Sequence, residues 1–243
     1  SQSVVIEKDY KQCLKLLQDK GLKFEVIESI PVHEDIKLGK PTRDKYIANY
    51  IENIRRVASI GVKVICYNFM PVFDWTRTDL AHQLPDGSNA LSYDDDTIAT
   101  WDIENEEVSL PGWDASYTKD QMRAVMEEYK SVDEETLWEH LRYFLERVIP
   151  VAEEVDVKMA IHPDDPPWNI FGLPRIITNK ENLERFCKLV DSPYNGLTLC
   201  SGSLAADEKN DIAELVRYFG GMGRIHFAHM RNIKRTGGRS FEE

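Results

Sequence analysis

The stretch that decides the fold is VKVICYNFM at residues 62–70, an almost unbroken apolar run. A strand that is apolar on both faces is typical of a parallel sheet covered by helices. Just upstream, residues 43–59 carry apolar side chains at helical spacing, and Gly61 follows as a stop signal. The sequence therefore predicts a helix leading into a buried parallel strand.

The same alternation of helix and strand continues on both sides of this stretch. Four more strands are predicted, at residues 23–29, 158–162, 197–201 and 224–232. Helical spacing separates each strand from the next, which indicates parallel βαβ units. Such units build either a (β/α)₈ TIM barrel or a doubly wound open sheet. No GxGxxG or GxxxxGK[ST] motif follows any predicted strand, so the nucleotide-binding forms of the open sheet lose their main support.

Residues 71–130 interrupt this alternation. They include Pro85-Asp86-Gly87, the acidic run 94–96 and one predicted helix at 119–129. The segment is far longer than the roughly 4–6 residues of an ordinary connection. We interpret 71–130 as an insertion within a single TIM-barrel domain spanning 1–243, forming a lid or an oligomer contact, with its acidic run on a solvated face.

Composition excludes several classes of protein. The 243 residues carry 30 Lys and Arg against 42 Asp and Glu, a net charge of −12, which disfavours binding to nucleic acid. No apolar run approaches the roughly 20 residues that a membrane span needs, and no signal peptide is visible. The four cysteines form no CxxC pair, and Cys13 and Cys187 fall on the apolar faces of predicted helices. We therefore predict reduced thiols in a cytoplasmic protein.

Three successive predicted strands end in a side chain that can bind a metal, namely His162, Cys200 and His229. The carboxyl ends of parallel strands meet at one edge, where active sites lie. Each residue alone is more often a packed core residue, but the agreement of three strands favours an open metal site with three protein ligands. His226 lies an odd number of residues from His229 and so faces the other side of its strand.

The residues around these strand ends suggest contacts to a polyhydroxylated, anionic ligand. Asp165 lies in the rigid turn HPDDPP at 162–167, and Arg231 follows His229 by two residues. We expect Arg231 to hold a substrate carboxylate in bidentate fashion. Asp165, His33 and Asn68 are candidates for contacts to hydroxyl groups.

Longer motifs of this sequence resemble those of the mannonate dehydratase family. The matching stretches are IESIPVHEDIKLG at 27–39, CYNFMPVFDWTRTDL at 66–80, LPDGS at 84–88, LPGWD at 110–114, MAIHPDDPPWNIFGLPRII at 159–177 and HMRN at 229–232. HPDDPP followed by FGLPRI is a long and unusual string, so the resemblance is specific. It implies a (β/α)₈ barrel that dehydrates D-mannonate to 2-keto-3-deoxy-D-gluconate in hexuronate catabolism with Mn²⁺ or Fe²⁺.

The resemblance also implies roles for single residues. The family's metal ligands fall on His162, Cys200 and His229. Its fourth ligand, an Asp, and the catalytic His that follows belong to a later strand, so we expect that ligand and the general base beyond Glu243. By the same comparison the chain lacks the barrel's first strand and its last two, and holds about five β/α units plus the insertion.

Other functions stay open at this point. A sugar or sugar-acid isomerase or epimerase of the same barrel superfamily would use the same ligands, because those enzymes also bind a divalent metal. A non-catalytic protein with a metal or sugar-acid site is the alternative from another class. We expect a small sugar-acid substrate, a homo-oligomer, and no partner among nucleic acids or membranes.

Overall fold

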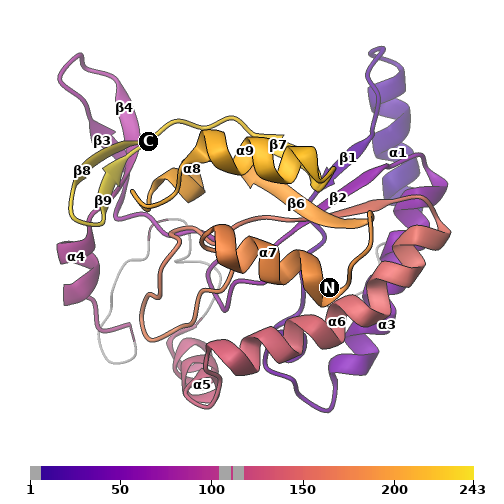
Figure 1. Cartoon of the computed structure of the whole chain (residues 1–243), viewed down its shortest axis with the longest axis horizontal. Coiled ribbons are helices and arrows are strands. Elements are labelled where there is room, and N and C mark those ends of the chain that lie inside the picture. The colour runs from indigo at the N-terminus through magenta and orange to yellow at the C-terminus, as the bar shows by residue number, and fades with distance from the viewer. Residues whose placement is uncertain (1–6, 104–110, 112–117) are drawn as a thin grey trace.

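Five parallel strands form the central sheet of the computed structural model, which describes residues 7–103, 111 and 118–243. The sheet has the order β1-β2-β5-β6-β7 and every neighbouring pair is parallel (Figure 1). Its strands are β1 (Val26–Glu28), β2 (Val64–Tyr67), β5 (Lys158–Ile161), β6 (Asn195–Cys200) and β7 (Ile225–His229). Each overlaps one predicted strand, so this part of the prediction is confirmed.

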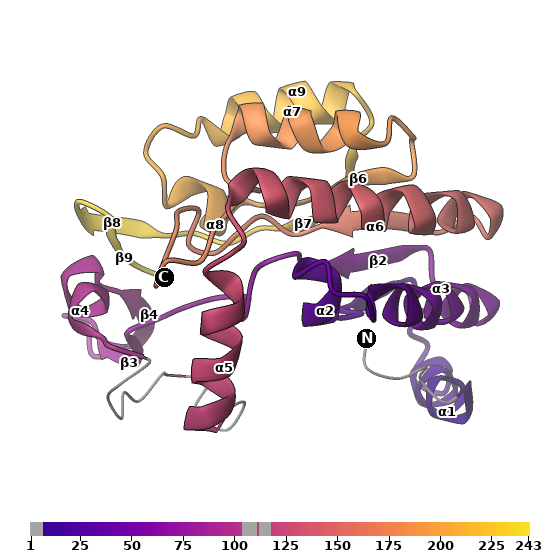
Figure 2. The same cartoon turned by 90° about the horizontal axis from the view of Figure 1, so that it is seen from below.

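The sheet is curled, because β7 approaches β2 and β5 although other strands separate them in the sheet order. Helices cover its outer side (Figure 2). The main ones are α3 (Arg43–Ser59), α6 (Glu134–Glu154), α7 (Lys180–Leu189) and α9 (Ile212–Gly221). Their apolar faces and the strands form one core, in which Ile65, Phe144 and Phe186 are fully buried. The result is an α/β fold with a curled parallel sheet.

A second, antiparallel sheet was not predicted. Its order is β3-β4-β9-β8, and it joins the hairpin of β3 (Asp79–Gln83) and β4 (Asn89–Tyr93) to β9 (Ser240–Glu242) and β8 (Lys234–Gly237). The hairpin lies inside the predicted insertion 71–130. Most side chains of β3 are exposed, so its sequence lacks the apolar alternation that would have marked it as a strand.

Among the residues that the structure describes, the insertion also contains two helices, which are joined by turns and irregular segments. The predicted helix at 119–129 is confirmed as α5 (Lys119–Tyr129). The acidic run begins α4 (Asp95–Thr100), where the Asp94 side chain accepts a hydrogen bond from the Thr97 amide. None of the three aspartates of this run is buried, and the first of them also caps a helix. Of the LPGWD motif at 110–114, only Pro111 lies within the described residues.

Three short or peripheral helices complete the description, α1 (Glu7–Gln18), α2 (Glu34–Lys37) and α8 (Ser201–Ala205). Cys187 is buried as expected, but Cys13 is exposed because α1 lies at the margin of the fold. Within the described ranges, none of the helices is both long enough and apolar enough to cross a lipid bilayer.

Gly196 on β6 leaves room for a side chain from the neighbouring strand. The ring of His226 lies over it and reaches the main-chain oxygen of Met159 on β5, 3.0 Å from His226 Nδ1. A Cβ at residue 196 would lie 2.4 Å from His226 Cε1 and 2.5 Å from the Arg224 oxygen. This lack of space makes glycine necessary at residue 196.

We predict that Gly196→Ala lowers the free energy of unfolding by about 1–3 kcal/mol, because overpacking forces His226 and the backbone to move. Urea denaturation measures the change. Gly221→Ala is the matched control, since a Cβ there meets nothing within 4 Å and alanine is favoured over glycine in a helix. Equal stability of Gly196→Ala and the wild-type protein would contradict the prediction.

Candidate metal centre

The three predicted metal ligands come together at the carboxyl edge of the curled sheet. Cys200 ends β6 and pairs in register with His229, which ends β7, while His162 directly follows β5. Their ligand atoms all lie within 4.8 Å of one another. Parallel pairing accounts for this convergence, because it places neighbouring strand ends side by side.

The hydrogen bonds of the two histidines determine which nitrogen of each ring is free. His162 Nδ1 lies 2.7 Å from the Pro163 carbonyl oxygen, and His229 Nε2 lies 2.9 Å from Glu28 Oε2. A carbonyl and a carboxylate both accept, so we assign the ring protons to these two nitrogens. The other two, His162 Nε2 and His229 Nδ1, face each other 3.1 Å apart. Two facing lone pairs need a proton or a cation between them.

The thiol of Cys200 completes this donor set. Burial would raise its pKa, but the hydrogen bond and charge of His162, followed by the charge of Arg231, outweigh burial and lower the pKa to about 6. Cys200 is therefore a thiolate at neutral pH, the form that binds metals. The pKa of His162 is raised: burial would lower it, but the neighbouring Cys200 more than compensates. One thiolate and two imidazole nitrogens fit a divalent transition metal.

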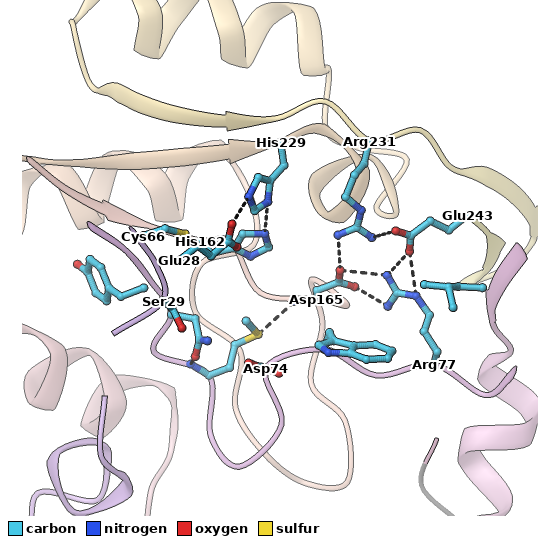
Figure 3. Close-up of a pocket in the computed structure, with 15 residues that line it drawn as sticks. Glu28, Ser29, Cys66, Asp74, Arg77, His162, Asp165, His229, Arg231 and Glu243 are labelled. Atoms are coloured by element: carbon cyan, nitrogen blue, oxygen red, sulfur yellow. Dashed lines mark hydrogen bonds and ion pairs between the residues drawn. The ribbon is translucent and has the colours of Figure 1, made fainter. Parts of the chain in front are cut away.

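A network of buried charges lies beside this cluster, as Figure 3 shows. Asp165 is 1 % exposed and accepts two hydrogen bonds from Arg77, of 2.9 and 3.1 Å, and one of 3.1 Å from Arg231. Ser203 donates a further one of 3.0 Å to Asp165 Oδ2. Although burial would raise the pKa of Asp165, the two guanidinium groups hold it below its usual range.

Glu243 joins the same two arginines from the other side. Its carboxylate accepts hydrogen bonds from Arg77 and pairs with Arg231 Nη2. Arg231 Nη1 also lies 3.5 Å from Cys200 Sγ, and so connects the charge network to the candidate metal ligands. Gly202 makes room for this side chain, because a Cβ there would lie 2.8 Å from Arg231 Cβ.

A pocket opens between the candidate metal ligands and the network of buried charges. His162 and His229 line one part of it, and Arg231, Asp165 and Arg77 line another (Figure 3). Asn68 also lines the pocket, in keeping with its candidacy as a contact to hydroxyl groups.

Two predicted contact residues have other partners. Both oxygens of Asp165 are already occupied by Arg77, Arg231 and Ser203, so this residue orients the arginines. His33 accepts a hydrogen bond from the Asp35 amide at the start of α2 and stacks on Tyr46 at 3.6 Å. It is not among the described residues that line the pocket.

Several residues that line the pocket were not among the predicted site residues, and they include Glu28, Arg77 and Glu243. Glu28 could have been found, because it ends a predicted strand just as the three donors do. Arg77 lies in a quoted family motif, but nothing in the sequence pairs it with Asp165. Glu243 reaches the pocket through the antiparallel sheet that was not predicted.

The fold and the pocket define an α/β protein with a curled parallel sheet and strand-end donors on one edge. A solved structure from Anabaena variabilis ATCC 29413, described as a putative sugar phosphate isomerase/epimerase, shares this fold with a TM-score of 0.50 at 15% sequence identity, covering 91% of this chain and 56% of that one. At that identity the likeness concerns the fold alone.

The sequence comparisons define the family. The family model of D-mannonate dehydratase (UxuA) matches residues 5–243, and the chain belongs to this family, as its motifs predicted. It is 61% identical over 223 residues to Mannonate dehydratase 2 of Halalkalibacterium halodurans, covering 92% of this chain and 65% of that protein. It is 59% identical over 246 residues to the mannonate dehydratase of Thermotoga maritima, covering 96% and 68%.

The mannonate dehydratase structure from Streptococcus suis serotype 2 aligns with a TM-score of 0.90 at 47% identity, covering 99% of this chain and 65% of that one. The chain thus spans about 65% of the length of the first of these relatives.

We predict that the absorbance of the metal-free protein near 240 nm rises as the pH is raised, with a midpoint at about pH 6. The rise reports the Cys200 thiolate, because the pKa of this thiol is lowered to about 6. Below this pH the thiol is protonated and does not absorb there; above it the thiolate does. A pH titration in the presence of a chelator measures the step.

Cys200→Ser should remove this step and Cys66→Ser should leave it, because burial raises the pKa of the Cys66 thiol to about 12. A step that survives in Cys200→Ser would contradict the prediction.

Proposed function

We propose that this chain forms the metal-binding and carboxylate-binding part of a hydro-lyase that converts D-mannonate to 2-keto-3-deoxy-D-gluconate in hexuronate catabolism. The observation that carries the proposal is the convergence of His162, Cys200 and His229 within 4.8 Å, beside Arg231 in one pocket. Membership of the D-mannonate dehydratase family supports the choice of substrate and reaction.

His162, Cys200 and His229 would hold Mn²⁺ or Fe²⁺, the metals that the family resemblance implies. The set of two imidazoles and one thiolate also accepts zinc and cobalt. When bound, such an ion supplies Lewis-acid chemistry, which stabilises negative charge on substrate oxygens and assists the loss of hydroxide. Among the described residues we assign no fourth ligand and no general base.

Arg231 would bind the substrate carboxylate. Its guanidinium lies between the candidate metal ligands and the charge network, so a carboxylate bound there would bring the neighbouring carbon atoms toward the metal. Asp165 would keep Arg231 in place. The substrate oriented in this way would lose water across its C2–C3 bond. Asn68 would contact a hydroxyl group.

The remaining proposals concern the whole protein. We propose that the curled sheet belongs to a (β/α)₈ barrel domain, with 71–130 as an insertion that contributes to a homo-oligomer contact, in a cytoplasmic enzyme. The tight pairing of β4 with β9 supports an insertion that is part of the same domain.

A sugar-acid isomerase or epimerase is the second candidate, favoured only by the shared fold. The two reactions differ in mass balance, since dehydration gives a keto-deoxy acid lighter by one water, whereas isomerisation conserves mass. Mass spectrometry of the intact enzyme's product from D-mannonate, with added Mn²⁺ or Fe²⁺, separates them. Recovery of an isomer of unchanged mass would overturn the proposal.

We predict that Cys200→Ala in the intact enzyme reduces turnover of D-mannonate by more than about 100-fold, because the loss of a ligand exceeds the 10–100-fold effect of disturbing a ligand's neighbour. The assay follows the keto-deoxy acid over time.

Cys187→Ala is the matched control, since Cys187 is buried on α7 and is not among the pocket's lining residues. It should retain turnover at temperatures where the protein stays folded. Full turnover by Cys200→Ala, or by protein stripped of metal, would contradict the proposal.

A further inference from the structure

Glu28 connects the two edges of the parallel sheet. It ends β1, whereas its partner His229 ends β7, at the opposite end of the strand order and 201 residues later in the chain. The two side chains meet because the sheet is curled, and Glu28 Oε2 lies 2.9 Å from His229 Nε2 (Figure 3). Glu28 belongs to the pocket lining, and its side chain is 44% exposed.

The contact determines how His229 presents its ring. Since a carboxylate only accepts, Nε2 carries the ring proton and Nδ1 keeps its lone pair. That lone pair faces His162 Nε2 across 3.1 Å, within the candidate donor set. A ring turned by 180° would instead present Cδ2–H to His162 and Cε1–H to Glu28, which would leave no donor atom for a cation and no hydrogen bond to the carboxylate.

We propose that Glu28 is a positioning residue for the metal centre, which fixes His229 as an Nδ1 ligand and strengthens it as a donor. The inference rests on the metal site of the proposed function. A carboxylate that accepts the outer N–H of a metal-bound imidazole holds the ring and raises its basicity. His162 has the weaker version of this arrangement, since its outer nitrogen donates to the neutral carbonyl of Pro163.

The charges agree with this role. The thiolate of Cys200 and the carboxylate of Glu28 together supply two negative charges close to the place of a divalent cation. Cys66 adds none, because burial raises the pKa of its thiol to about 12. Glu28 is not part of the donor cluster itself, which among the described residues consists of His162, Cys200 and His229.

Titration of the chelated protein with Co²⁺ tests the proposal. The dissociation constant for Co²⁺ should rise about 10–100-fold in Glu28→Ala, and less in Glu28→Gln, whose amide oxygen still accepts but is neutral. The cobalt–thiolate absorption of Cys200 should persist in both variants. Glu25→Gln is the matched control, because it removes the same charge from an exposed residue just before β1.

Long-range ¹H–¹⁵N spectra of the Zn²⁺-loaded wild-type protein give a second readout that is independent of affinity. They should show His229 protonated at Nε2 and bound through Nδ1. A metal bound through Nε2 of His229 would overturn the proposal, since Glu28 could then not accept from that nitrogen.

Two outcomes of the Co²⁺ titration would overturn the proposal. Unchanged Co²⁺ affinity in both Glu28 variants overturns the proposal, and so does the loss of a ligand from the cobalt spectrum, which would make Glu28 a ligand. Unfolding of the metal-free variants is measured alongside, and if Glu28→Ala does not fold, the isosteric Glu28→Gln carries the comparison. Failure of the wild-type protein to bind any metal would instead refute the proposed function.

Discussion

The parallel pairing of five strands is the constraint on which the site depends. All five strands run in the same direction, so their carboxyl ends meet at one edge of the sheet. The register between β6 and β7 then places Cys200 beside His229. The curl of the sheet adds Glu28 from the far edge, which a flat sheet of the same order could not bring near His229.

The second constraint is the cost of burying charge. Asp165 and Arg77 are almost completely buried, and such groups are stable only when each finds its partners. The two arginines satisfy Asp165, and Glu243 supplies the further negative charge that two guanidinium groups require. This balance keeps Arg231 extended over Gly202 and directed at the pocket. The network therefore fixes the position of the Arg231 guanidinium at the pocket.

The predictable and unpredictable parts of the molecule differ in the range of the interactions that form them. The strand at 62–70 and the helix at 119–129 could be predicted because their signals are local, an apolar run and helical spacing. The convergence of His162, Cys200 and His229 could be predicted because the strand-end rule needs only the order of the elements.

The role of Asp165 could not be predicted, since its partners Arg77 and Arg231 are brought to it by tertiary structure alone. His33, which lies in a family motif and was predicted to contact hydroxyl groups, accepts a hydrogen bond from the Asp35 amide and caps α2. The pairing of β4 with β9 could not be predicted for the same reason as the partners of Asp165, because the two strands are distant in sequence.

That distance has a consequence for the order of folding. Tyr93 pairs with Phe241, and the Asp95 amide bonds to the Ser240 hydroxyl across 145 residues of chain. Contacts between such distant residues require the closure of a long loop, which slows their formation. The βαβ units between them bury their own apolar faces and form through shorter loops. We therefore expect the antiparallel sheet that precedes Glu243 to assemble after the parallel sheet, so that Arg77 and Arg231 acquire their full set of partners late in folding.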